Sequence, residues 1–184
     1  MSVLRRWSHR RRVALLAWGA LPLAALPLAW SAAATGALLP PGSVLADGAV
    51  LSASSARLAG LVYAGTVTVP TTAGEAVVLE LTSTSASLTG LALHVPCRPA
   101  GPPGGMKVDA VTGDSTSTAE QGMTVYATSV SGTAGGSAFA WTPDTPPGTA
   151  QLGDVAITDL VVELVAFEAP TLTTPSLRQS AEFC

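Results

Sequence analysis

Residues 58–63 (LAGLVY), 88–93 (LTGLAL) and 157–162 (ITDLVV) repeat one short pattern. In each copy, a large apolar residue is followed three positions later by Leu and five positions later by another large apolar residue. Gly or Asp stands between the first two. Side chains of a strand alternate between its faces, so positions three apart point the same way only where the strand bulges or bends. The pattern predicts bent β-strands that share one core, and the alternative is chance recurrence in a chain rich in Ala, Leu, Thr and Gly.

Short β-branched runs dominate the chain after residue 50. Each run is bounded by Gly, Pro, Ser or Asp, which is typical of strands joined by turns. Outside the N-terminal segment, no window of the length of a helix carries a convincing helical period of apolar residues. We therefore predict one all-β domain over residues 51–184, built either as a β-sandwich or as a short β-solenoid-like roll. The runs lie at 67–69, 77–81, 124–126 and 155–157.

Segments rich in Pro, Gly, Ser and Thr separate these runs. Residues 96–105 (PCRPAGPPGG) and 143–148 (PDTPPG) are predicted loops, because proline has no N–H to donate to a sheet ladder. Residues 112–121 and 131–137 are predicted polar turns, and residues 35–50 are a predicted extended lead-in. None of these segments has the length of a domain linker, so we expect a single domain.

The N-terminal segment has the three parts of an export signal. Residues 1–12 carry five arginines, residues 13–30 form an uncharged apolar run, and residues 31–34 (SAAA) supply small side chains. Arginines stay on the cytoplasmic side while an apolar run enters the membrane. The segment is therefore expected to engage the membrane and the export machinery.

We predict that residues 1–34 are a signal peptide, cut after Ala34 at a small-residue site formed by Ala32 and Ala34. The alternative is an uncleaved membrane-anchor helix over residues 13–30, whose 18 residues lie near the lower end of the roughly 17–25 that span a bilayer. The consecutive arginines leave both the Sec and the twin-arginine routes open. Either way, the domain is expected outside the cytoplasm, extracellular or associated with the cell envelope.

Charge is sparse and unevenly distributed. Of 184 residues, 11% are charged, with nine basic against twelve acidic. This balance argues against nucleic-acid binding and against charge-driven disorder. Without the first 34 residues, four basic residues remain against all twelve acidic ones, so the net charge of the remainder is −8.

The only two cysteines are Cys97 and Cys184. An even pair in an exported chain indicates one disulfide, which would tie the last residue to the mid-chain proline loop. Two free thiols, or an intermolecular bridge through Cys184, are the alternatives.

No catalytic, cofactor or metal site is predicted. The chain after the leader has one histidine, His94, which alternation places on the outer face of a strand whose Leu91, Leu93 and Val95 point inward. One histidine and two cysteines are too few for a zinc site, and no G-x-S-x-G nucleophile motif is present. We expect no enzymatic activity, with a secreted hydrolase of unrecognised site, using His94 as its only candidate base, as the alternative.

Three segments carry a resemblance: residues 124–132 (TVYATSVSG), 139–147 (FAWTPDTPP) and 168–177 (EAPTLTTPSL). With the Arg-rich leader, they resemble small, uncharacterised exported proteins of high-GC Gram-positive actinobacteria. The likeness covers most of residues 50–184. It implies a cell-envelope or extracellular location and no known activity.

The function expected from these observations is a structural or binding role, without catalysis, in the envelope or outside the cell. A lipid, a glycan or another envelope protein is the expected kind of partner. A lipid carrier with an apolar groove between strands is the main alternative.

Overall fold

Strands make up all the regular structure of the computed structural model, which describes residues 43–71, 74–96 and 106–183. The predicted all-β fold is confirmed. In these ranges, no helix has the length and apolar character needed to cross a membrane. The strands are β1 (Ser43–Thr71), β2 (Gly74–Ser83), β3 (Ser85–Thr89), β4 (Ala92–Val95), β5 (Met106–Val111), β6 (Thr116–Ala119), β7 (Met123–Ala134), β8 (Ser137–Trp141), β9 (Gln151–Glu168) and β10 (Arg178–Phe183).

The first seven strands form an antiparallel meander, in which the chain runs along β1, back through β2 to β4, and forward again through β5 to β7. β1 is one long bent strand, and β2, β3 and β4 run back along a single edge of it. β5, β6 and β7 then run forward again, pairing with β4, β3 and β2 respectively. All ten strands belong to one sheet.

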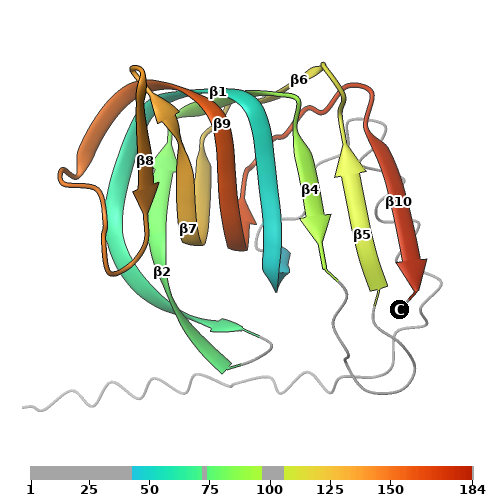
Figure 1. Cartoon of the computed structure of the whole chain (residues 1–184), viewed down its shortest axis with the longest axis horizontal. Coiled ribbons are helices and arrows are strands. Elements are labelled where there is room, and N and C mark those ends of the chain that lie inside the picture. The colour runs from blue at the N-terminus through green and yellow to red at the C-terminus, as the bar shows by residue number, and fades with distance from the viewer. Residues whose placement is uncertain (1–42, 72–73, 97–105, 184) are drawn as a thin grey trace, which may run out of the picture.

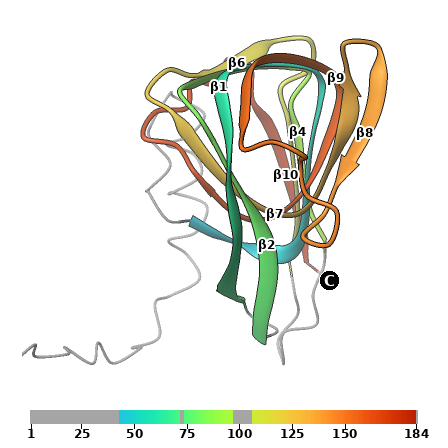
Figure 2. The ribbon, with the colours of Figure 1, turned by 90° about the vertical axis from the view of Figure 1, so that its left-hand side faces the viewer.

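Strand β9 closes part of this sheet into a ring. One edge of β9 pairs with β1 and the other with β7, while β7 pairs with β2 and β2 with β1. The circuit β1–β2–β7–β9–β1 is therefore continuous, as Figure 2 shows from the side. Beyond the ring, β4, β5 and β10 extend the sheet as a flat wing on the right of Figure 1.

The repeated sequence pattern marks bends within β1 and β9 and the bend that joins β3 to β4. Its middle residues, Gly60, Gly90 and Asp159, all have positive φ, at 56°, 66° and 53°. The register slips between Leu58 and Leu61 where β1 pairs with β9, and opposite Asp159 where β9 pairs with β7. A residue in the left-handed conformation changes the direction of the strand and lets the pairing register slip.

The bends turn the pattern's apolar side chains inward, as predicted. The first two of every copy are buried and the third is buried or half-buried, packed against the same core. These nine side chains are Leu58, Leu61, Tyr63, Leu88, Leu91, Leu93, Ile157, Leu160 and Val162.

Side chains from neighbouring strands hold the bends. The Ser54 hydroxyl donates to the carbonyl oxygen of Thr89, at 3.0 Å, beside the bend at Gly90. The backbone N–H of Gly60 donates to Oδ1 of Asp154, at 2.8 Å. Each of these two bends thus uses a polar partner from the strand across the sheet.

Three sequence predictions about segments need correction. Residues 43–50 of the expected lead-in form the start of β1 and pair with β9 and β4, so the sheet begins before residue 51. The polar segment 112–121 contains β6, whose small residues Ser117 and Ala119 are buried in the sheet. Residues 131–134 continue β7, and the turn is confined to Gly135 and Gly136.

Candidate functional site

The interior of the ring is filled by side chains. The cavity inside it measures about 40 Å³, well below the roughly 150 Å³ that accommodates benzene in an engineered protein cavity. Its walls are apolar and come from six of the strands, β1, β2, β3, β7, β8 and β9. Residues that line it include Leu61, Leu88, Val130, Trp141, Ile157 and Phe167. As described, this cavity is too small to hold an acyl chain.

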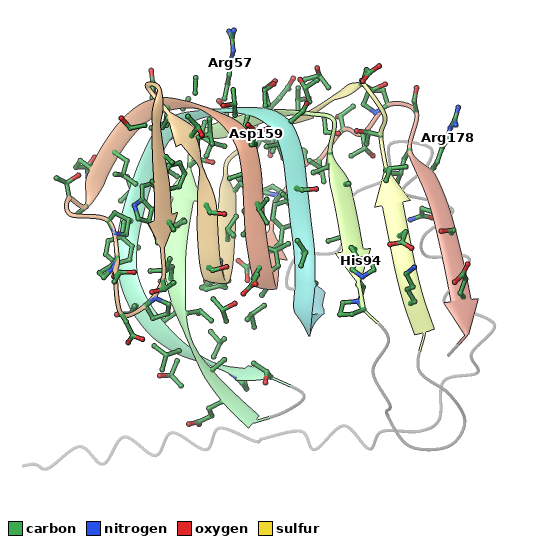
Figure 3. All side chains as sticks on the ribbon, in the orientation of Figure 1. Arg57, His94, Asp159 and Arg178 are labelled. Atoms are coloured by element: carbon green, nitrogen blue, oxygen red, sulfur yellow. The ribbon has the colours of Figure 1, made fainter. Side chains whose placement is uncertain are left out.

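A small charged cluster lies on the outer face of the wing. His94 of β4 faces Asp109 of β5 directly across the sheet, with 2.5 Å between His94 Nδ1 and Asp109 Oδ1. Lys107 Nζ lies 3.1 Å from the other oxygen of Asp109. His94 is exposed on this face, as predicted from strand alternation, while Leu91 is buried and Leu93 and Val95 are half-buried against the core. Figure 3 labels His94 at the lower end of β4.

The electrostatics of this cluster centre on Asp109. Hydrogen bonds from His94 and Lys107 lower the pKa of Asp109, because both favour the ionised carboxylate. Asp109 in turn raises the pKa of Lys107. All three side chains are partly in water, so the cluster is a surface ion-pair network of modest stabilising value.

A histidine oriented by a carboxylate is two thirds of a hydrolytic triad, and the third part is a nucleophile at the free nitrogen. In the sheet, His94 pairs with Val50 on its other side, and Ser180 lies beyond Asp109 on β10. Neither residue directly opposite His94, Val50 on β1 or Asp109 on β5, carries a hydroxyl. The residues that the structure describes also include no group of three or more His, Cys, Asp or Glu that could hold a metal ion.

A groove of about 390 Å³ lies on the outside, where the extended β1–β2 hairpin meets β7 and β9. Its floor and walls are mostly aliphatic, and Val165 below it is buried although it lies outside the ring's core. Tyr126 stands between Glu80 and Glu168 at the rim. Burial and the two carboxylates raise the pKa of Tyr126. Such a surface suits an apolar or cationic group better than an anion.

The predicted disulfide and cleavage residues lie outside the described part of the chain. These are Cys97, Cys184, Ala32 and Ala34. The strands that lead to the two cysteines are described: β4 and β10 run in the same direction on either side of β5. Their last residues therefore lie at one end of the wing, as Figure 1 shows.

The His94–Asp109 pair was not predicted from the sequence. The two residues are separated by a proline-rich loop, and only the register of the β4–β5 pairing brings them together. The one sequence signal for this pair would have been an alternation of exposed and buried positions in the segments on both sides of that loop.

Comparison with known proteins gives no relative: no family model, no curated protein and no solved structure matches the chain.

Proposed function

We propose that the chain is a non-catalytic exported protein of the cell envelope or the extracellular space, with a structural or binding role. The export part rests on the arginines of residues 1–12, the apolar run of 13–30 and the small residues at 31–34. The same leader and the three resembling segments support the proposal that the chain belongs with exported actinobacterial proteins.

The proposed structural or binding role rests on one observation: the ring of strands is closed and its interior is filled. The ring leaves a cavity of only about 40 Å³, and β9 pairs with β1 and with β7 between Ile157 and Phe167, with register shifts along the way. A rolled sheet with so small an interior cavity supports a role for its outer surfaces rather than for its inside. Its outer faces are the parts suited to contact with a lipid, a glycan or another envelope protein.

One observation favours the alternative that the protein carries a lipid: the outer groove between the β1–β2 hairpin, β7 and β9. Its volume of about 390 Å³ falls within the roughly 300–1,000 Å³ of small-molecule sites, and its lining is mostly aliphatic. A carrier of this kind would bind its lipid in this groove rather than inside the ring, where the cavity measures only about 40 Å³.

Two measurements on the exported protein test the proposal. Fractionation and N-terminal sequencing should recover a mature chain that begins near residue 35, outside the cytoplasm. Organic extraction followed by mass spectrometry should release no stoichiometric lipid. A cytoplasmic protein with an intact Met1 would overturn the export proposal, and a reproducible bound lipid would favour the carrier. Loss of a hydrolytic activity on His94→Ala would revive the enzyme alternative.

A further inference from the structure

The outer edge of the wing is an open strand. β10 ends the strand order of the sheet, and within the described ranges it pairs only with β5. Its side chains from Arg178 to Glu182 are all exposed. Natural sheets protect such edges with prolines, bulges or charged side chains, because an open edge offers unpaired backbone N–H and C=O groups to another strand. β10 is six residues long, contains no proline and pairs with β5 without a bulge. Its charged side chains, Arg178 and Glu182, have opposite signs, so they do not repel a second copy of the same strand.

The sequence of β10 is complementary to itself. Arg178 and Glu182 stand at equal distances on either side of Ser180. When two copies of the strand pair antiparallel about a two-fold axis at Ser180, each Arg178 lies opposite Glu182 of the second copy. Opposite charges directly across an antiparallel pair attract, whereas like charges in the same positions repel. Both cross-strand charge pairs are therefore favourable in this one register.

The neighbouring strand extends the charge pattern. Arg178, Ser180 and Glu182 share a face because strand residues alternate, and on that face Glu182 lies opposite Lys107 of β5. In the paired form, Lys107, Glu182 and Arg178 of the second copy would form a row of alternating charge. Within the described residues, no ion pair involves Arg178, and Figure 3 shows its side chain projecting from the end of the wing.

We propose that two copies of this chain associate through β10, antiparallel about Ser180, so that their wings form one continuous sheet. The contact is isologous, since the same edge is used by both copies. Backbone pairing supplies the affinity and the two Arg178–Glu182 pairs select the register. Because the interface is a single short strand with exposed charges, the dimer is weak and weakens further with salt.

Charge-reversal variants of the full chain, recovered after export, test this interface. Arg178→Glu places two acidic pairs across the axis, and Glu182→Arg places two basic pairs. Each variant alone should dimerise about tenfold or more weakly than the unmodified chain. An equimolar mixture should dimerise again, because every cross-strand pair between one variant and the other then joins an acidic to a basic side chain. Arg57→Glu, a charge reversal on an exposed residue at the bends, is the matched control.

Sedimentation equilibrium over a range of concentrations and salt measures the outcome. Circular dichroism and thermal melts of each variant show that it is folded, and recovery in the mixture shows that both partners are intact. The proposal is overturned if the unmodified chain stays monomeric at millimolar concentration. It is equally overturned if the mixture associates no better than its two components.

Discussion

Substituting Gly90 by alanine probes the bends that turn the apolar residues inward. Gly90 has a φ of 66°, a left-handed conformation that costs an L-residue roughly 1–2 kcal/mol. A Cβ at this position would also lie 2.6 Å from the Ser54 hydroxyl oxygen. That hydroxyl must then move away from the Thr89 carbonyl, to which it donates at 3.0 Å. The lost hydrogen bond adds about 0.5–1.5 kcal/mol.

Together these effects predict that Gly90→Ala destabilises the domain by about 2–3 kcal/mol. This is a large share of the roughly 5–15 kcal/mol of a typical domain. Urea unfolding followed by circular dichroism measures the loss. The control is Gly135→Ala in the β7–β8 turn, where φ is 57° and no atom lies within 4 Å of the added Cβ. It should cost only the conformational part, about 1–2 kcal/mol.

Two companion variants separate the two contributions. In a Ser54→Ala background, Gly90→Ala should cost less than in the unmodified chain, because the 2.6 Å clash with the hydroxyl is gone and only the 3.2 Å approach to the Cβ of residue 54 remains. Asp159 occupies the equivalent bend with a side chain at φ 53°. Because Asp tolerates this conformation better than alanine does, and glycine adds entropy to the unfolded chain, Asp159→Gly should leave the stability of the domain within about 1 kcal/mol of its original value. A Gly90→Ala variant that costs no more than Gly135→Ala would refute the reasoning.

Three further predictions concern packing, the disulfide and pH. Gly132→Ala should destabilise by about 1–3 kcal/mol in the same unfolding assay, since its Cβ would meet Ile157 Cγ2 at 2.6 Å; an unchanged midpoint would contradict this contact. Non-reducing mass spectrometry of the exported protein should find a peptide that links Cys97 to Cys184, and two freely alkylated thiols would exclude the bridge. Asp109→Asn should lower stability above about pH 4, because the pKa of Asp109 is lowered in the folded state. The difference should vanish as the pH falls through that lowered pKa, and a difference that persists at lower pH would rule out this cause.

The bends were predictable because local sequence specifies them. A spacing of three between apolar residues is incompatible with strand alternation, and Gly60, Gly90 and Asp159 are residue types that tolerate positive φ. The four β-branched runs all lie in strands for a similar reason, since their side chains suit a pleated surface.

Two features could not be predicted from the sequence: the closure of the ring, and the cluster of His94 and Asp109 on the wing. Both depend on pairing between distant segments. β9 joins β1 and β7 across most of the length of the domain. β6 was read as a turn because its sequence, TSTA, is polar and small. Ser117 is fully buried there, so burial in this strand does not follow apolar character. His94 and Asp109 meet only through register.

Hydrogen exchange in β9 tests the closed, filled ring most directly. Residues 161–164 and Ala166 of β9 are paired with β1 on one edge and β7 on the other, so their backbone groups are freed only when the ring opens. The account predicts that this segment exchanges among the slowest in the domain, with protection that approaches the global free energy of unfolding. Exchange of the same amides as fast as those of the Gly135–Gly136 turn would contradict the closed ring and the structural role built on it.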